Sequence, residues 1–308
     1  MAHRAASTDP SAAPAPSRLQ VWTWAARPKT LAAAVAPVLL GTAFAVEAGA
    51  FHGPAALCAL LAAVLIQIGT NFSNDYVDYL KGADTDDRVG PLRVTQAGLV
   101  PPERMRRATI AVFAGAFIVG SYLIWRGGWP VLAIGLASIL FGVLYTAGGR
   151  YSLAYLGVAD LFVLLFFGPV AVAGTFYVQA LTVTPAVVMA GFGPGLLATA
   201  VLLVNNIRDV RQDRAAQKRT LVVRLGRPAG VALYAACVLL AAKLPVGLWL
   251  AGSGAPWAML ASAALLPAVP MIYTLATERN PAKLNPLLGR TGQLLLLYAV
   301  LFSVGWVI

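Results

Sequence analysis

Long apolar runs, separated by short polar segments, recur along the whole chain. A run of about 20 apolar residues can cross the hydrocarbon layer of a membrane as a helix, and lipid offers no partner to an unpaired backbone amide. The pattern therefore predicts an all-α membrane protein with nine transmembrane helices in one bundle. The predicted spans are residues 30–50, 55–79, 108–126, 129–147, 153–175, 182–207, 229–251, 255–277 and 290–308.

Composition supports this prediction. Of the 308 residues, 59% are hydrophobic and only 11% are charged, which lies outside the range of ordinary soluble domains. Residues 1–20 are rich in Ala, Pro and Ser, and we expect them to form a disordered N-terminal tail. Residues 21–308 are then expected to form a single transmembrane domain.

The basic residues alternate with the predicted spans. All of them except Arg126 and Lys243 fall in loops on one side. Because Lys and Arg gather on the cytoplasmic side of membrane proteins, we expect a multi-pass protein of the cell membrane with a cytoplasmic N-terminus and an outer C-terminus. The same rule accounts for the net charge of +11 without a nucleic-acid partner. Cys58 and Cys237 lie in apolar segments and indicate neither a disulfide nor a metal site.

The first acidic cluster follows the second predicted span. Asn71, Asn74, Asp75 and Asp78 are spaced i, i+3, i+4 and i+7, which places them on one face of a helix that continues to residue 79. Gly82 is expected to end that helix, and a further acid, Asp84, follows it.

A second acidic cluster follows the sixth predicted span. Asn205, Asp209 and Asp213 are spaced i, i+4 and i+8, again on one helix face. The two clusters share an Asn-x-x-x-Asp pattern and basic residues just beyond it, so we interpret them as an approximate internal repeat and expect two Asp-rich cytoplasmic loops.

Carboxylates this close repel one another, and near lipid they are costly to keep charged. Mg²⁺ offsets that repulsion, because it prefers one or two carboxylates with water and substrate phosphates as its other ligands. The candidate metal ligands are Asp75, Asp78, Asp84, Asp209 and Asp213. The candidate diphosphate-binding residues are Asn74, Arg88, Arg93, Asn205, Lys218 and Arg219. The alternative is two interfacial loops in which acids and bases only pair with each other.

At these residues the sequence resembles the UbiA superfamily of intramembrane aromatic prenyltransferases, nine-helix proteins with two Asp-rich motifs. The first motif resembles the branch that uses 1,4-dihydroxy-2-naphthoate. The resemblance covers nearly all of the chain after residue 20. One position departs from the general superfamily pattern: Gly82 stands four residues beyond Asp78, and the acid comes at Asp84, as in that branch. Which of Asp75, Asp78 and Asp84 binds metal directly is left open. The residues that carry the resemblance are NDYVDYLKGADTDDRVGPLRVTQAG, ARPKTLAAAVAPVLLGTAFA, QIGTN, LYTAGGRYSLAYLGVADLFVLLFFGPVAVAGTFYVQ and NNIRDVRQDRAAQKRTLVVRLG.

The resemblance implies a reaction. A polyprenyl diphosphate would bind with its head group between the motifs, and Mg²⁺ and basic residues would stabilise the departing diphosphate. The ring of 1,4-dihydroxy-2-naphthoate would attack the allylic cation with loss of CO₂, giving demethylmenaquinone. The catalytic candidates are Asp78, Asp84, Asp209, Asp213 and Tyr145, and the electron-rich wall for the cation could come from Tyr145, Tyr76 or Phe72.

Four further residues are candidates for binding the aromatic acceptor: Lys29, Gln67, Asn71 and Asp160. Each has a structural alternative. Lys29, like Arg27, could simply anchor the first span at the membrane surface. Gln67 could hydrogen-bond to a neighbouring helix, and Asp160 could pair with Arg150.

Two other functions compete with this hypothesis. The protein could be a prenyltransferase of the same superfamily with another aromatic acceptor or a phytyl donor. It could also be a cation-coupled transporter, since such proteins combine internal repeats with intramembrane acids. The acids here gather at one membrane face rather than at mid-span, which favours capture of a head group at the interface.

Overall fold

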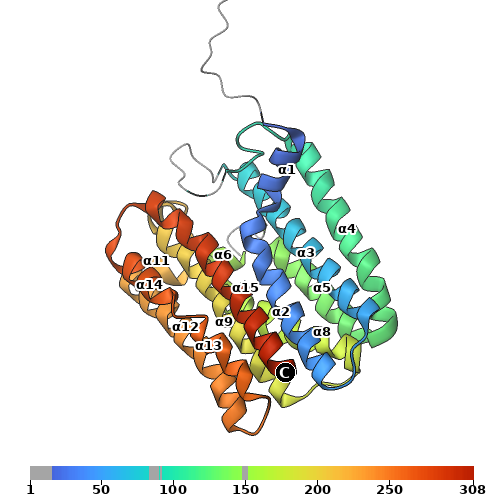
Figure 1. Cartoon of the computed structure of the whole chain (residues 1–308). Helices are drawn as coiled ribbons and strands as arrows, with labels where there is room; N and C mark the ends of the chain where they lie inside the picture. The colour runs from blue at the N-terminus through green and yellow to red at the C-terminus, as the bar shows by residue number, and fades with distance from the viewer. Residues whose placement is uncertain (1–15, 83–89, 91, 148–151) are drawn as a thin grey trace, which may run out of the picture.

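The computed structural model describes residues 16–82, 90, 92–147 and 152–308, and within these ranges the regular structure is helical, without a β-strand. Figure 1 shows the helices as a bundle in which α2 and α15 lie side by side at the centre. The helices are α1 (Arg18–Ala26), α2 (Pro28–Glu47), α3 (Gly53–Leu80), α4 (Pro102–Gly127), α5 (Trp129–Leu144), α6 (Leu153–Leu156), α7 (Ala159–Leu165), η2 (Phe166–Val170), α8 (Ala171–Ala180), α9 (Pro185–Arg208), α10 (Val210–Ala215), α11 (Leu221–Leu225), α12 (Arg227–Leu250), η3 (Pro256–Met259), α13 (Leu260–Ala263), α14 (Ala268–Thr277), η4 (Pro281–Leu284) and α15 (Asn285–Val307).

Eight helical segments within the described ranges are long and apolar enough to cross a membrane. They correspond to eight of the nine predicted spans, several of them broken into shorter helices. The fourth predicted span, residues 129–147, is instead α5, an apolar helix of 16 residues. Its length is below the roughly 20 residues that a perpendicular span requires, so nine spans remain a prediction.

Helical structure begins earlier than the sequence suggested. Most of the predicted tail, residues 1–20, lies outside the described residues, but α1 already starts at Arg18. A capping box explains this start: the Ser17 hydroxyl accepts from the Gln20 amide, and the Gln20 side chain accepts from the Ser17 amide. Residues 18–20, which were predicted to belong to the tail, therefore lie in α1.

The largest buried apolar cluster lies where α2, α9, α12 and α15 meet. The most extensive helix pairs are α15 with α2, α12 with α9, and α3 with α4. Both acidic clusters lie outside this apolar cluster, the first on the last turns of α3 and the second at the end of α9 and in α10.

The span from α7 to α8 is broken at η2, where Gly168 has non-helical dihedrals (φ −117°, ψ −114°) and Pro169 follows it. The break lies against α9, and the glycines of both segments permit the close approach. A Cβ built on Gly195 would lie 2.3 Å from the Leu164 carbonyl oxygen, and one on Gly191 would lie 2.6 Å from the Pro169 Cα. Residues 191–195, with the sequence GFGPG, thus form a helix-packing motif in α9.

Candidate functional site

The first acidic cluster forms the predicted stripe on the final turns of α3. Asn71, Asn74, Asp75 and Asp78 are all buried, and all lie within the helix. Within the described residues the acids of this cluster therefore lie on the last turns of α3, and the two Asp-rich cytoplasmic loops remain a prediction. Asp84 and Arg88 lie outside the described residues.

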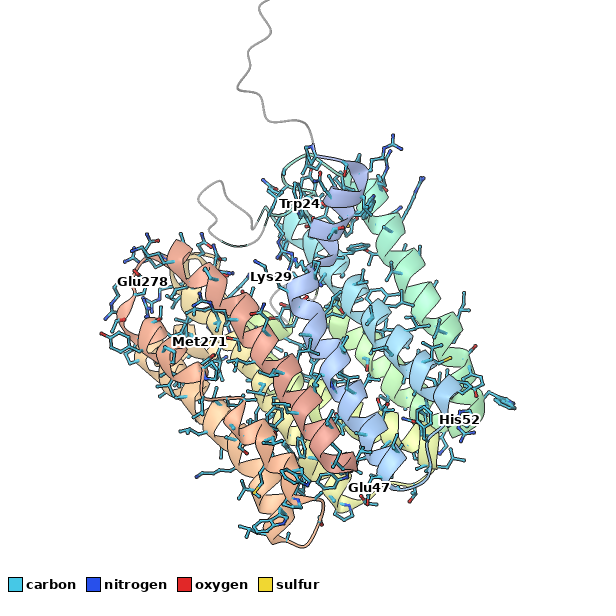
Figure 2. The ribbon with its side chains drawn as sticks, in the orientation of Figure 1. Trp24, Lys29, Glu47, His52, Met271 and Glu278 are labelled. Carbon is cyan, nitrogen blue, oxygen red and sulfur yellow. The ribbon has the colours of Figure 1, made fainter. Side chains whose placement is uncertain are left out.

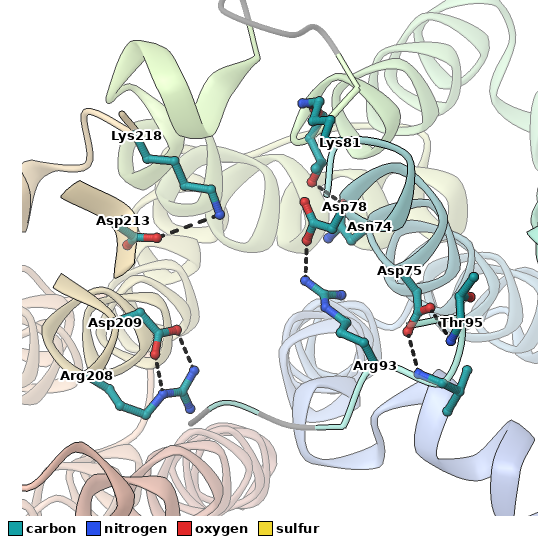
Figure 3. A network of polar contacts seen from close by, with 12 residues as sticks. Asn74, Asp75, Asp78, Lys81, Arg93, Thr95, Arg208, Asp209, Asp213 and Lys218 are labelled. Atoms are coloured by element: carbon teal, nitrogen blue, oxygen red, sulfur yellow. Dashed lines mark hydrogen bonds and ion pairs between the residues drawn. The ribbon is translucent and has the colours of Figure 1, made fainter. Parts of the chain in front are cut away.

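The members of this stripe face different surroundings. Asn74 and Asp78 line a polar cavity of about 140 Å³. Asp78 accepts a hydrogen bond from the Arg93 guanidinium, and the Asn74 side-chain oxygen accepts one from the Thr146 hydroxyl at 2.6 Å. Asn74 and Asp78 therefore form one wall of the cavity, which Figure 3 shows beside Arg93.

Asp75 does not line the cavity, although it was expected to bind metal. Asp75 is 1% exposed, and its carboxylate accepts hydrogen bonds from the backbone amides of Val94 (3.2 Å) and Thr95 (3.0 Å). These two bonds fix the segment that directly follows Arg93. Asp75 thus holds Arg93 in place against the α3 wall. In this structure the Asp75 side chain positions Arg93 and does not itself line the cavity.

The second acidic cluster forms the facing wall, at the end of α9 and in α10. Asp209 caps the C-terminus of α9, Asp213 lies in α10, and Asn205, one turn earlier in α9, also lines the cavity. Arg208 donates to both carboxylate oxygens of Asp209, from Nε at 2.7 Å and from Nη2 at 2.6 Å. Its third contact, from Nη1 to the Asn285 side-chain oxygen at 2.9 Å, ties this wall to α15.

Asp213 is the most electrostatically perturbed acid of this wall. Burial raises the pKa of Asp213 to about 6, and the ammonium of Lys218, 3.7 Å away, opposes that rise. A carboxylate that lines a cavity and has a pKa perturbed by burial and by a neighbouring charge is a candidate functional residue.

Basic side chains complete the cavity. Arg27, Arg93, Arg208 and Lys218 all line it. Arg27 joins α1 to α2 in a left-handed conformation (φ 53°), which is unusual for a residue with a side chain. Such strain persists only where the surroundings enforce it, and it clusters at functional sites.

Two predicted acceptor residues hold this junction instead of facing the polar cavity. The Asn71 amide donates to the Ala26 carbonyl (2.9 Å) and to the Thr30 hydroxyl (3.0 Å), and Gln67 donates to the same hydroxyl at 3.4 Å. The Thr30 hydroxyl donates to the Arg27 carbonyl (2.9 Å). The Gln67 and Asn71 side chains thereby stabilise the turn that brings Arg27 to the cavity.

Lys29 and Arg219 lie outside the polar cavity, whereas Asp160 lines it. Lys29 and Arg219 are exposed, and a Cβ built on Gly289 would lie 3.5 Å from the Lys29 Cδ. Figure 2 shows Lys29 at the Trp24 end of the bundle, opposite Glu47 and His52.

A second cavity, of about 250 Å³, is almost entirely apolar. Side chains from α2, α3, α4, α5, α7, η2 and α8 line it, among them Phe141, Phe162 and Phe166, whose rings contact one another. Tyr145 lines both cavities and marks their boundary. Gln67 lines the apolar cavity only.

Three residues of this region were missed in the candidate site. Arg208 entered the sequence analysis only as one of the basic residues that predict the membrane orientation. Its position directly before Asp209 could have indicated that the two side chains interact. Thr146 and Lys81 had no such signal. The Lys81 ammonium donates to the Thr146 carbonyl, so that it joins the end of α3 to the segment after α5.

The donor set has the chemistry that Mg²⁺ requires. Asp78, Asp209 and Asp213 supply carboxylate oxygens, and Asn205 an amide oxygen, with no thiolate or imidazole among the lining residues. In the described part of the chain no three acids lie close enough together to hold a metal by themselves. The acids stand on facing walls, as Figure 3 shows, which fits a hard cation whose remaining ligands come from a substrate between the walls.

The comparisons with known proteins agree with this geometry. A protein of Escherichia coli (strain K12) named 1,4-dihydroxy-2-naphthoate octaprenyltransferase is 39% identical over 298 residues, covering 94% of this chain and 96% of that one. A protein of the same name from Mycobacterium tuberculosis (strain ATCC 25618 / H37Rv) is 37% identical, covering 91% of this chain and 94% of that one. The structure of a UbiA homolog from Archaeoglobus fulgidus bound to DMAPP and Mg²⁺ has the same fold, with a TM-score of 0.62 at 18% identity over 92% of this chain and 99% of that one.

The family model described as the UbiA prenyltransferase family matches residues 34–306, which include both walls of the polar cavity and nearly all of the helical bundle. This chain therefore belongs to the UbiA prenyltransferase family.

Proposed function

We propose that this protein transfers a polyprenyl chain from polyprenyl diphosphate to 1,4-dihydroxy-2-naphthoate, with loss of CO₂ and diphosphate, giving demethylmenaquinone for menaquinone biosynthesis. The observation that carries the proposal is the pair of cavities that share Tyr145. One is polar and has acids and bases on facing walls, and the other is apolar. The names of the relatives that match most of the chain support the choice of acceptor.

The polar cavity is suited to a diphosphate. Arg93 and Lys218 contact Asp78 and Asp213, and both basic side chains line the cavity. An entering diphosphate would draw these cations toward its oxygens. Because the leaving group gains negative charge as the allylic C–O bond breaks, cations already held at the cavity stabilise the transition state more than the bound substrate.

Asp78, Asp209 and Asp213 are the residues that would hold Mg²⁺, with Asn74 and Asn205 beside them. When bound, the ion would neutralise these acids and the diphosphate oxygens together. The contacts of Asp75 with Val94 and Thr95 would support this arrangement from behind the wall.

The apolar cavity would hold the prenyl chain next to its head group. Tyr145 stands where the allylic carbon would lie, and its ring would offer an electron-rich face to the developing cation. A transporter would use acids at mid-span, whereas here both walls lie at helix ends. Together with family membership, this placement favours the transferase.

The apolar helices and the family make this an integral membrane protein. Most of its basic residues lie on the side of the polar cavity, and Arg126 lies at the far end of α4. The site and the N-terminus would therefore face the cytoplasm of the cell membrane. Labelling a cysteine introduced at Ser17 or at Ser253 in intact cells tests this orientation, and only Ser253→Cys should react with an impermeant reagent.

The function is tested with purified protein in detergent, a polyprenyl diphosphate and either 1,4-dihydroxy-2-naphthoate or 4-hydroxybenzoate. We expect a prenylated naphthalene product with Mg²⁺, none with EDTA, and little transfer to 4-hydroxybenzoate. Glu103→Gln changes an exposed acid that pairs with Arg106 and serves as the control. Prenylation of 4-hydroxybenzoate alone would reject the proposed acceptor.

A further inference from the structure

Asp160 is the unusual acid of the polar cavity. It lies at the start of α7, is 6% exposed, and lines the cavity. Apart from its own backbone amide, neither of its carboxylate oxygens has a hydrogen-bond partner among the described residues. Asp78, Asp209 and Asp213 each have a basic partner in the same cavity. Asp160 thus differs from the acids assigned to Mg²⁺ and diphosphate.

A buried carboxylate without partners is costly, because it has lost its water and gained nothing in return. A cavity-lining group of this kind is therefore matched to a ligand that supplies a hydrogen-bond donor. An ionised carboxylate only accepts hydrogen bonds, and a diphosphate at neutral pH offers mostly acceptor oxygens. The head group of the prenyl donor is consequently a poor partner for Asp160, whereas a hydroxyl group is a good one.

The position of Asp160 points to the same ligand. Two residues further along α7, Phe162 lines the apolar cavity, and Tyr145 lines both cavities. Asp160 therefore lies near the boundary where the head group would meet the prenyl chain. The attacking ring must reach this boundary, since the allylic carbon lies there. Arg27, which lines the same cavity, supplies the charge that suits a carboxylate on that ring.

We propose that Asp160 accepts a hydrogen bond from a ring hydroxyl of the aromatic acceptor and thereby selects the dihydroxy form over its quinone or methyl ether. The inference rests on the proposed function. A quinone oxygen is itself an acceptor, so it would leave the buried carboxylate facing a second acceptor. A site built around a buried hydrogen-bonding group rejects analogues that lack the matching donor. The hydrogen bond also raises the electron density of the ring, and it requires no covalent change at Asp160.

The test compares wild-type protein, Asp160→Asn and Asp160→Ala on 1,4-dihydroxy-2-naphthoate, 1-hydroxy-2-naphthoate and 4-hydroxy-2-naphthoate. In wild type, loss of the hydroxyl that meets Asp160 should lower kcat/KM for the acceptor by about 10- to 100-fold. In Asp160→Ala, kcat/KM for 1,4-dihydroxy-2-naphthoate should fall by a similar factor. The acceptor that lacks the same hydroxyl should then react with Asp160→Ala almost as well as the dihydroxy acceptor does. The KM for polyprenyl diphosphate and the Mg²⁺ concentration for half-maximal rate should not change.

Binding provides a readout independent of turnover. The shift in melting temperature caused by 1,4-dihydroxy-2-naphthoate, measured in EDTA, should be large in wild type and small in Asp160→Asn. The unliganded Asp160→Asn protein should melt no lower than wild type, because a buried charge has been removed. Glu47→Gln, at an exposed acid at the far end of α2, should behave as wild type in both readouts.

Either of two results would overturn the inference: an unchanged acceptor shift in Asp160→Asn, or a raised Mg²⁺ requirement with an unchanged KM for the acceptor, which would make Asp160 a metal ligand. If wild type binds the dihydroxy acceptor but does not prenylate it, the proposed function fails. The binding comparison then still decides the role of Asp160.

Discussion

The two walls of the polar cavity carry similar sequence clusters, but the fold uses them differently. On the α3 wall the acids lie on one continuous helix, and their basic partner Arg93 comes from a segment 15 residues away that Asp75 pins. On the α9–α10 wall the helix breaks at Asp209, and the partners Arg208 and Lys218 lie one and five residues from their acids. The acid–base contact of the α3 wall therefore depends on the tertiary fold, whereas those of the α9–α10 wall form between residues that are close in sequence. Matching positions of the two acidic clusters therefore need not have the same role.

The largest effect should come from removing one cavity acid from either wall. We expect Asp78→Ala and Asp209→Ala each to lower kcat by about 100- to 1,000-fold, because each removes a carboxylate that would hold Mg²⁺, whose positive charge would stabilise the leaving group. Steady-state prenyl transfer with saturating Mg²⁺ measures this. A large loss in only one of the two variants would show that the walls do not act together.

The next effect should separate Asp75 from the cavity acids. Asp75→Asn keeps one acceptor for the amides of Val94 and Thr95 and loses the other, so Arg93 should be less well held. We expect kcat/KM for the prenyl donor to fall by about 10- to 100-fold, as for outer residues that orient a site. The Mg²⁺ concentration for half-maximal rate should stay near the wild-type value, and a rise as large as that of Asp78→Asn would instead make Asp75 a ligand.

A smaller effect should appear with pH on the α9–α10 wall. The pKa of Asp213 is raised by burial to about 6, so protons compete with Mg²⁺ below that pH and not above it. Lowering the pH from 6 to 5 should raise the half-saturating Mg²⁺ concentration by about fivefold. Titration of the purified protein with Mg²⁺ at each pH measures it. Asp213→Asn should bind Mg²⁺ more weakly and lose this pH dependence, and a dependence that survives the substitution would come from another group.

The smallest effect should distinguish two adjacent bases. Lys218 lines the cavity beside Asp213, whereas Arg219 is exposed outside it. Lys218→Ala should raise the KM for the prenyl donor by about tenfold. Arg219→Ala should leave it within about twofold, as is usual for surface substitutions. Equal effects in the two variants would place Arg219 at the diphosphate after all.

The helical bundle and the acidic stripe were predictable because both follow from local periodicity. Apolar runs marked the ends of the long helices to within about six residues, and the spacing from Asn71 to Asp78 placed that stripe on α3. Even the fourth span was found as a helix, although α5 is shorter than predicted. The start of α1 was missed where a short capping signal overrode the composition of the tail.

The partners of the site residues were not predictable in the same way. Asp75 and Asp78 share a helix face in sequence, but a segment near residue 94 covers one of them and leaves the other at the cavity. Gln67 and Asn71 were predicted to bind the aromatic acceptor, which stays a prediction. Their hydrogen-bond partners, which lie more than 35 residues away on the α1–α2 junction, were not predicted. Long-range contacts of this kind depend on the packing of whole helices, which a local pattern does not encode.

The most direct test of the central claim is binding of inorganic diphosphate with Mg²⁺ to wild type, Asp78→Asn, Asp209→Asn and the double variant. If the two walls hold one diphosphate between them, each single variant should lose most of the affinity, and the double variant should bind about as weakly as either single one. Losses that simply add in the double variant, or a full loss from one wall and none from the other, would contradict the account.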